Sequence, residues 1–313
     1  MKRLVYGIIL STFIVVLAAC GQNNEDANND AAETITIEHD LGETEVSKNP
    51  ESIVVFDFGI LDTLDILDID VDGVPRGNIP TYLEEYTSEQ YEDVGSLKEP
   101  DFDKIAEIDP DVIIISGRQS TLYDELSNIA PTIHLDIDTT NYMESFESNL
   151  SVIAELFDVE EEIDQKLEDI HESIDELQTI ADDYGQESLI ILANDDKISA
   201  YGPHSRFGLI HDVFGVPAVD KDIEASTHGQ NVSFEYVLET DPDLLYVIDR
   251  SAVVEGESAA EQIVENKLVQ KTSAYENDNI IYLDPNYWYL SGGGLVSIQA
   301  MIDEIQESLE NIE

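Results

Sequence analysis

Short apolar runs alternate with segments of helical periodicity along most of the chain. The runs at 52–56, 112–115, 188–192 and 244–248 have the length and β-branched content of buried strands. Strands that alternate with helices favour mainly parallel sheets joined by right-handed crossovers. The pattern therefore predicts an α/β fold.

Two segments of the chain repeat each other. Residues 101–118 and 233–250 each read as a short helix, an Asp-Pro-Asp turn and a buried strand that ends at an arginine. The runs at 52–56 and 188–192 are also followed by the same motifs, which are Phe-Gly at 58–59 and 207–208 and Gly-Val-Pro at 73–75 and 215–217. We expect two similar, Rossmann-like α/β lobes, at 34–142 and 186–313.

The region between the repeats, 143–185, predicts a long helix. It has no glycine or proline before Gly185, and its apolar residues recur at three- and four-residue spacing, at Ile163, Leu167, Ile170, Ile174, Leu177 and Ile180. This spacing is also typical of an ordinary core helix. As the one link between the repeats, the helix could serve as a stiff spine that holds two lobes at a nearly fixed angle.

The N-terminus has the layout of a secretory signal. A basic pair at 2–3 precedes a short apolar run, and Leu-Ala-Ala then leads into Cys20, which resembles a bacterial lipobox. We expect a signal peptide at 1–19, a lipid on Cys20 and a disordered polar tether at 20–33. An unmodified free thiol at Cys20 is the alternative.

Composition narrows the choice of function. The 69 acidic residues outnumber the 14 Lys and Arg and give a formal net charge of −55, which repels nucleic acid and anionic lipid. A single cysteine excludes a disulfide within the chain. The sequence has no nucleophile elbow, no phosphate loop and no dinucleotide fingerprint, so we expect a protein that is not an enzyme. A cell-surface hydrolase or an adhesin is the rival class.

The arginines are few, and their positions indicate a binding site. The chain has five, at Arg3, Arg76, Arg118, Arg206 and Arg250. Arg118 and Arg250 follow matching strand ends of the repeat, where open α/β sheets bind ligands, and Arg206 precedes a Phe-Gly helix start. Each could instead pair with a local carboxylate. Three guanidinium groups in one cleft of so acidic a protein would require an anionic, specific ligand.

Two further segments could reach a metal ion. His228 lies in a polar loop, and Tyr287 and Tyr289 flank Trp288 just before three consecutive glycines. Phenolate is a hard oxygen donor suited to Fe(III), and imidazole also binds iron. The alternative is a loop histidine and two packing tyrosines. The other five histidines are scattered without paired-ligand spacing, which argues against a free-metal site.

Together these features resemble the helical-backbone, class III periplasmic-binding-protein fold, which serves siderophore, haem and cobalamin importers. The resemblance covers nearly the whole mature chain. The segments at 54–59, 94–100, 115–118 and 287–290 are similar to the catecholate-siderophore receptors of Gram-positive and related bacteria, including petrobactin binders.

The resemblance implies a ligand and its contacts. Arg118, Arg206 and Arg250 match the arginines that meet the anionic catecholates. His228 and Tyr289 match residues that complete the iron shell when the siderophore leaves sites open, with Tyr287 as the fallback. The ligand would be the Fe(III)–siderophore, with no intrinsic cofactor. A hydroxamate siderophore, haem or a corrinoid on the same fold is the nearest rival, although a neutral hydroxamate complex would not need three arginines.

The resemblance also implies partners and a location. The family docks on its ABC permease and ATPase complex through an acidic residue on each lobe, and the repeat places Asp103 opposite Glu235. Glu99 is a nearby alternative, because Asp103 is shorter than the usual glutamate. We expect a monomer held by Cys20 on the extracytoplasmic face of a cell membrane, in a Gram-positive organism.

Overall fold

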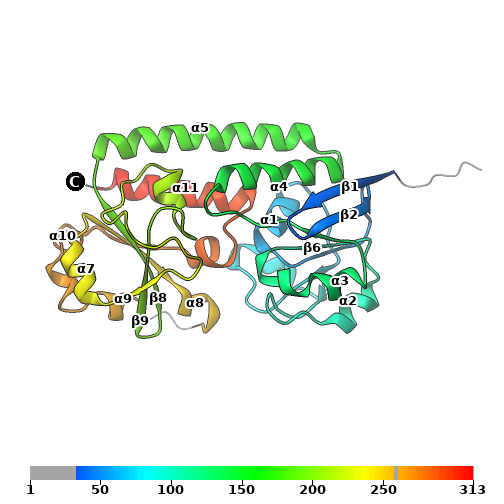
Figure 1. The fold of residues 1–313 in the computed structure, drawn as a ribbon, viewed down its shortest axis with the longest axis horizontal. Helices are drawn as coiled ribbons and strands as arrows, with labels where there is room; N and C mark the ends of the chain where they lie inside the picture. The colour runs from blue at the N-terminus through cyan, green and yellow to red at the C-terminus, as the bar shows by residue number, and fades with distance from the viewer. Residues whose placement is uncertain (1–32, 257–259, 313) are drawn as a thin grey trace, which may run out of the picture. The chain divides into compact units, whose positions relative to one another are not determined.

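Two five-stranded sheets organise the residues that the structure, a computed structural model, describes: 33–256 and 260–312. From Glu33 onward the chain forms one compact unit. The predicted signal peptide, Cys20 and all but residue 33 of the predicted tether lie outside the described residues. We call residues 33–141 the first half, and residues 186–256 with 260–312 the second half (Figure 1).

The sheet of the first half is entirely parallel, with strand order β5-β4-β3-β6-β7. Its central strands are the predicted apolar runs, and every residue of β3 and β6 is buried. An antiparallel hairpin, β1 with β2, precedes the sheet. The strands are β1 (Thr34–His39), β2 (Gly42–Ser47), β3 (Ile53–Val55), β4 (Gly73–Val74), β5 (Glu92–Asp93), β6 (Val112–Ile115) and β7 (Thr132–His134).

Two helices of the first half, α1 and α2, begin at an aspartate whose side chain caps them. Asp57 accepts the backbone N–H groups of Gly59 and Ile60 at the start of α1, and Asp101 accepts that of Lys104 at the start of α2. The helices are α1 (Phe58–Ile66), the 3-10 helix η1 (Thr81–Thr87), α2 (Phe102–Ile108), the 3-10 helix η2 (Gly117–Leu122) and α3 (Tyr123–Ser127).

Two helices occupy the predicted connecting region. They are α4 (Tyr142–Phe157) and the 25-residue α5 (Glu160–Tyr184). The break falls at Asp158, whose φ of 55° places it in the left-handed region that ends helices. The long helix expected from the apolar spacing is confirmed as α5, which ends at Gly185 as predicted. It packs along both α4 and α11 (Figure 1).

The second sheet, of order β10-β9-β8-β11-β12, is mixed. Strands β8, β11 and β12 are parallel, but β9 and β10 run antiparallel to their neighbours. A two-residue turn after Asn194, with Asp195 at a φ of 53°, closes a hairpin where we expected a crossover. The strands are β8 (Ser188–Asn194), β9 (Lys197–Tyr201), β10 (Gln230–Val232), β11 (Leu244–Asp249) and β12 (Ile280–Leu283).

The sequence repeat has a structural counterpart. Helices α2 and α7 each end at an aspartate in the left-handed region, Asp109 and Asp241, and a proline follows each. The chain then enters β6 and β11. The second half contains α6 (Leu209–Asp212), α7 (Phe234–Thr240), α8 (Arg250–Val254), α9 (Ala260–Val264), the 3-10 helix η3 (Val269–Lys271), α10 (Ser273–Glu276), the π-helical turn η4 (Asn286–Leu290) and α11 (Leu295–Glu310).

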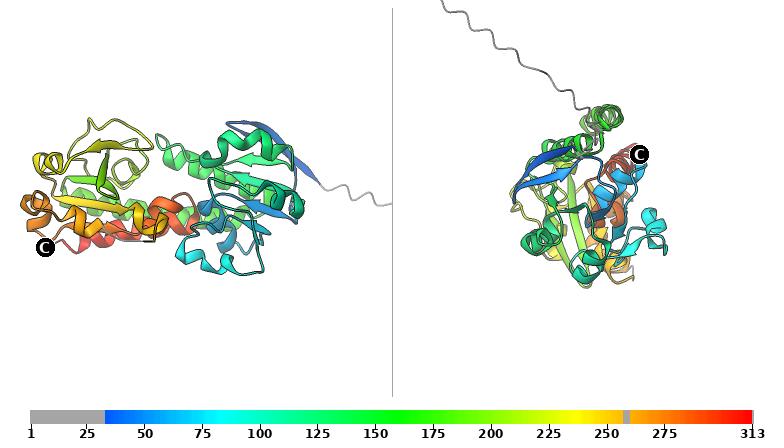
Figure 2. Two further views of the ribbon diagram at one scale, coloured as in Figure 1. Left: turned by 90° about the horizontal axis from the view of Figure 1, so that it is seen from below. Right: turned by 90° about the vertical axis from the view of Figure 1, so that its right-hand side faces the viewer.

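Helix α11 ties the end of the chain to elements that lie far from it in the sequence. It packs against both α1 and α5, and Figure 2 shows it in red running toward the first half. A Cβ added to Gly59 would lie 2.7 Å from the carbonyl carbon of Gly293, so the two backbones approach closely. Among the described residues, no helix is long and apolar enough to cross a membrane.

Candidate ligand-binding site

Three arginines meet at Tyr289. Arg118 and Arg206 each donate from Nη2 to the carbonyl oxygen of Tyr289, over 3.0 Å and 2.6 Å. Arg250 donates from Nε to the phenol oxygen of the same residue over 3.0 Å. One tyrosine therefore gathers three guanidinium groups from distant parts of the chain.

Two of these arginines stand at matching strand ends. Arg118 lies in η2 just after β6, where Gln119 Oε1 accepts the backbone N–H of Ser116 and Ser116 Oγ donates to Asp57. Arg250 opens α8 directly after β11, and the carboxylate of Asp249 caps that helix through the N–H of Ala252. The carboxyl ends of parallel strands thus present both side chains, as the repeat implied.

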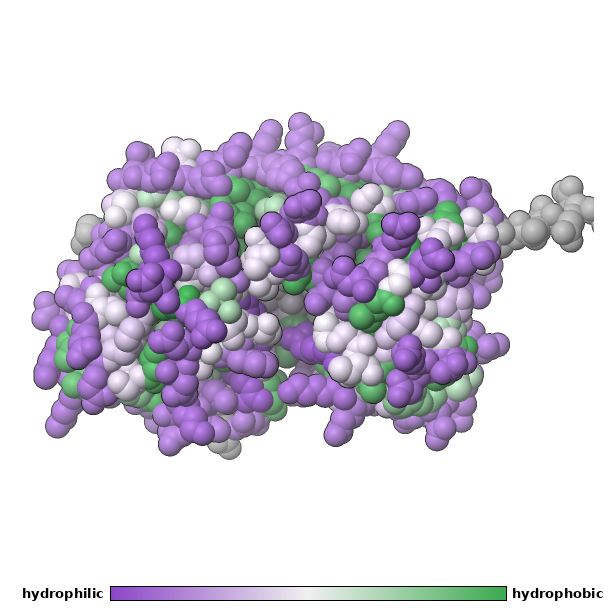
Figure 3. All heavy atoms as spheres, viewed as in Figure 1, coloured by the Kyte–Doolittle hydropathy of each residue, from purple (hydrophilic) through white to green (hydrophobic). Residues whose placement is uncertain are grey.

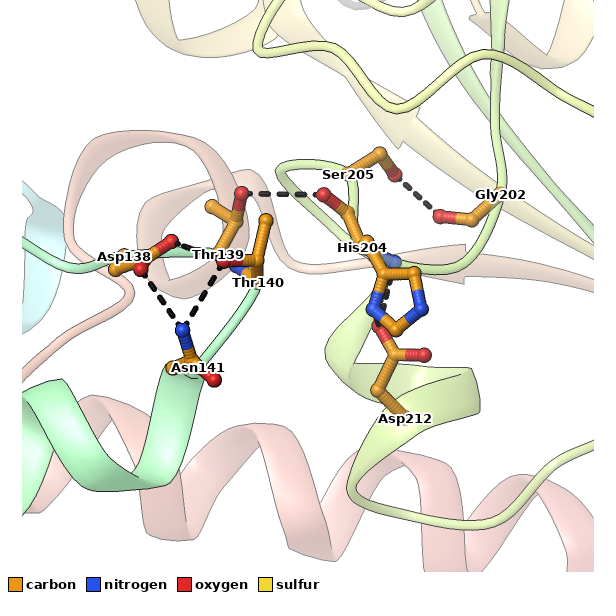
Figure 4. A network of polar contacts seen from close by, with 8 residues as sticks. All are labelled: Asp138, Thr139, Thr140, Asn141, Gly202, His204, Ser205 and Asp212. Carbon is orange, nitrogen blue, oxygen red and sulfur yellow. Dashed lines mark hydrogen bonds and ion pairs between the residues drawn. The ribbon is translucent and has the colours of Figure 1, made fainter.

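Arg206 reaches the site by a different route. It follows the antiparallel β9, in a turn where Ser205 Oγ donates to the carbonyl of Gly202. Its guanidinium lies 4.4 Å from the centre of the Tyr289 ring and 5.2 Å from that of Phe207. Figure 4 shows the adjoining contact between the two halves, in which Thr139 donates to the carbonyl of His204 over 3.3 Å.

The positive charges of the three arginines lie close enough together to favour an anion at this site. Burial lowers the pKa of the Arg206 guanidinium, and the nearby charge of Arg118 lowers it further. Burial alone would raise the pKa of the Tyr289 phenol, but Arg206 and Arg250 outweigh it and lower that pKa below its ordinary value. A phenolate or another anion placed here would be stabilised by the surrounding cations.

The arginines differ in what balances them. Arg250 Nη1 donates to Asn194 over 2.7 Å and lies 3.5 Å from a carboxylate oxygen of Glu255, which is half-exposed. Arg118 and Arg206 direct their Nη2 groups to a neutral carbonyl instead. Local pairing with carboxylates, the alternative from the sequence, therefore describes Arg250 better than its two neighbours.

His228 lies on an exposed loop next to the Arg206 segment. The carbonyl of Ser226 accepts the backbone N–H of Arg206, and Ser226 Oγ accepts that of His228. Gly229, at a φ of +68°, lies so close to the Tyr201 ring that an added Cβ would come within 2.7 Å of it. The side chain of His228 itself is exposed, and its pairing with Tyr289 around one iron ion stays a prediction.

Tyr287, the fallback iron ligand, is used in packing. Its ring lies 4.7 Å from that of Tyr82, whereas Tyr289 carries the arginine contacts. Within the described residues, no group of three or more His, Cys, Asp or Glu side chains is arranged to hold a metal ion.

The predicted docking residues occupy equivalent exposed positions. Asp103 lies in the first turn of α2 and Glu235 in the first turn of α7. Glu99 is also exposed, in the loop before α2. Their role in docking stays a prediction.

Sequence reasoning missed several residues of the site. Asn194, which orients Arg250, ends β8, and because β8 is the parallel neighbour of β11 the strand-end rule points to it as well. Tyr201 and Phe207, whose rings lie 4.6 Å apart beside Arg206, gave no signal beyond ordinary packing. Arg76 is outside the site and donates to the carbonyls of Ser88 and Tyr91.

A model of the family described as periplasmic binding proteins matches residues 53–287. The chain belongs to this family. Its members bind substrates rather than transform them, so the prediction of a binding protein that is not an enzyme is confirmed. The predicted fold class is confirmed as well.

Two relatives cover most or all of the chain. The petrobactin-binding protein YclQ of Bacillus subtilis is 50% identical over 99% of this chain and 100% of its own length. The ferric-anguibactin-binding protein FatB of Vibrio anguillarum is 32% identical over 87% of this chain and 86% of its own.

Solved structures agree with the family assignment. The crystal structure of YclQ from Bacillus subtilis matches with a TM-score of 0.88 and 52% identity, over 89% of this chain and 99% of that one. The catecholate-siderophore binding protein VctP of Vibrio cholerae matches with a TM-score of 0.83 and 34% identity, over 88% of this chain and 100% of that one.

Figure 3 shows a hydrophilic surface that is hollowed between the two halves.

Proposed function

We propose that this protein captures an iron(III)–catecholate siderophore of the petrobactin type and delivers it to an ABC importer. The observation that carries the proposal is the meeting of Arg118, Arg206 and Arg250 at Tyr289. A ferric tris-catecholate carries about three negative charges, which three guanidinium groups would balance in a partly desolvated site.

The comparisons support the ligand class. YclQ is named for petrobactin, FatB for ferric anguibactin and VctP for catecholate siderophores. The identity to YclQ extends over nearly the whole chain, which favours a petrobactin-like ligand over the other two.

Siderophore binding would give Arg118 and Arg206 a stronger hydrogen-bond acceptor than the one they have now. Arg118 and Arg206 now donate to a neutral carbonyl, and a catecholate oxygen would accept the same forked donors in charge-assisted bonds that are roughly twice as strong. Where the siderophore leaves iron sites open, Tyr289 would ligate as a phenolate, which its lowered pKa favours, and His228 would complete the shell.

The rival ligands fit the arginine cluster less well. A neutral ferric hydroxamate would leave Arg118 and Arg206 facing only a neutral carbonyl, without an anion to balance them. The faces of haem or a corrinoid are apolar. Such a ligand would also gain little from the rigid, forked donors of arginine.

The proposed location and partners extend the same function. We place the protein on the extracytoplasmic face of the membrane, held by a lipid on Cys20. There Asp103 and Glu235, exposed on equivalent helices α2 and α7, would dock on a permease and its ATPase.

Fluorescence titration of the soluble domain tests the ligand class. Trp288 is the one tryptophan of the chain, is buried next to Tyr289 and donates from Nε1 to Glu304 over 2.7 Å. Ferric petrobactin and a ferric bis-catecholate are expected to quench it strongly, and ferrioxamine and haemin weakly. Tight quenching by ferrioxamine or haemin without a response to either catecholate would overturn the proposal.

A further inference from the structure

The segment that carries Tyr289, residues 286–294, follows β12 of the second sheet but is also held by residues 81–142, which lie far from it in the sequence. Five contacts join this segment to residues 81–142. They are Thr81 N–H to Asn286 Oδ1, the Tyr82 ring on Tyr287, Arg118 to the Tyr289 carbonyl, Tyr82 Oη to Ser291 Oγ and Tyr142 Oη to the Gly292 carbonyl.

The centre of this anchorage is Asp62, a fully buried carboxylate on α1. Its Oδ1 accepts the backbone N–H of Val296 over 3.2 Å, and its Oδ2 accepts that of Ser297 over 3.1 Å. Tyr82 Oη donates to Oδ2 as well, over 2.9 Å. Asp62 thus binds both the first turn of α11 and the side chain of Tyr82.

Helix α11 needs this carboxylate because its own cap residue is Gly294, which has no side chain to offer. A Cβ at Gly294 would lie 1.9 Å from Asp62 Oδ1, so the glycine leaves the space that the aspartate fills. Asp62 and Ser297 are 235 positions apart in the sequence. The first N–H groups of α11, which have no partner within the helix, are therefore capped from a distant helix.

Tyr82 extends the network to the binding segment. The same phenol oxygen lies 2.7 Å from Ser291 Oγ, two residues beyond Tyr289. Ser291 closes the π-helical turn η4, and its N–H donates to the carbonyl of Asn286. Ser291 therefore links Tyr82 to the turn that presents the Tyr289 carbonyl to Arg118 and Arg206.

We propose that Asp62 and Tyr82 are positioning residues for ligand binding: through Ser291 and the start of α11 they fix the turn that holds Tyr289 among the three arginines. This inference rests on the proposed function of that arginine site. It assigns to a buried carboxylate on α1 a role in a site that it does not touch.

The chain contains a matched control on the same two helices. Tyr86, four residues after Tyr82 on η1, donates to Asp65, three residues after Asp62 on α1, over 2.7 Å. The ring of Tyr86 packs on Tyr91 rather than on the 286–294 segment. Tyr82→Phe and Tyr86→Phe thus each delete one phenol that donates to an α1 carboxylate, but only the first lies in the path to Tyr289.

The first measurement compares affinities. Tyr82→Phe is expected to weaken binding of ferric petrobactin on the order of tenfold, read by Trp288 quenching, while Tyr86→Phe leaves it within about twofold. Thermal unfolding of both variants controls for a general loss of stability. Equal affinities of the two variants would overturn the inference.

The second measurement needs no ligand and separates this inference from the proposed function. Amide hydrogen exchange of residues 286–297 is expected to be faster in Tyr82→Phe, and faster still in Asp62→Asn, than in Tyr86→Phe. If the native protein fails to bind ferric petrobactin while exchange follows this order, the ligand is wrong and the positioning role stands. If exchange is the same in Tyr82→Phe and Tyr86→Phe, the positioning role is wrong whatever the ligand is.

Discussion

Arg206 contacts Tyr289 twice, with its guanidinium 4.4 Å from the ring centre and its Nη2 donating to the carbonyl of the same residue over 2.6 Å. The face of one guanidinium group and one of its N–H donors thus both contact one tyrosine. A lysine could supply the charge and either contact alone, but its ammonium has no planar group that stacks on the ring while one of its N–H groups donates to the carbonyl. The shape of Arg206, besides its charge, is part of the site.

Arg206→Lys therefore tests shape at constant charge. We expect it to weaken ferric petrobactin binding about tenfold, and Arg206→Ala by more than that, because the second also removes a cation. Isothermal titration at one salt concentration measures both. Lys104→Ala, which removes an exposed cation paired with Glu107, is the control for net charge and is expected to bind like the native protein. Native affinity in Arg206→Lys would contradict the role of the planar group.

Tyr289→Phe tests the phenol as an iron ligand. With a ferric bis-catecholate, which leaves iron sites open, the native complex is expected to show a phenolate-to-iron absorption contribution that the variant lacks. Visible difference spectra measure it. Tyr287→Phe, which alters the ring that packs on Tyr82, serves as the matched control and should keep the native spectrum. Identical spectra for native protein and Tyr289→Phe would exclude the phenol from the iron shell.

The pH dependence of stability tests Asp62. Burial raises its pKa to about 7, against the opposing hydrogen bonds from Ser297, Tyr82 and Val296. In the unfolded chain the group loses its proton near pH 4, so its contribution to stability is complete below that pH and is lost as the pH rises to about 7.

Asp62→Asn, which mimics the protonated form, removes that titration. The free energy of unfolding of the native protein, relative to the variant, should therefore fall between about pH 4 and pH 7 and then level off. Urea unfolding at a series of pH values measures this difference. A relative stability that rises over the same range would show that the folded protein favours the charged carboxylate below pH 7.

Gly294→Ala tests the close approach between α1 and α11. The added Cβ would lie 1.9 Å from Asp62 Oδ1 and 2.0 Å from the carbonyl oxygen of Gly59, so we expect a loss of about 2–3 kcal/mol in the free energy of unfolding. Gly185→Ala is the control, because its Cβ would meet nothing closer than 3.9 Å and its cost is the left-handed backbone alone, about 1 kcal/mol. Equal losses in denaturant unfolding would contradict the packing.

The sequence predicted the features that periodicity and repetition encode. The four apolar runs became buried central strands, and α5 ended at Gly185, the first glycine of the connecting region. Arg118 and Arg250 could be placed because a parallel strand delivers whatever follows it to one edge of its sheet.

Other features depend on contacts between residues far apart in the sequence, which periodicity and short motifs do not predict. The hairpin of β8 with β9 reversed the chain where we expected a crossover, so Arg206 reaches Tyr289 from an antiparallel strand. The cap that Asp62 gives to α11 joins residues 235 positions apart. In a chain with 69 acidic residues, nothing in the sequence distinguishes this aspartate from the others. The loop that carries His228 packs on the Tyr201 ring at Gly229, and neither a glycine nor a tyrosine in the sequence predicts that contact.

Whether these arginines hold the ligand is tested by the affinity of the Arg118→Ala, Arg250→Ala double variant for ferric petrobactin, measured by Trp288 quenching beside the native protein. We expect tight binding by the native domain and a loss of at least a hundredfold in the double variant, with affinity that falls as salt is raised. Native-like binding of ferric petrobactin by the double variant would contradict the assignment of the site to these arginines.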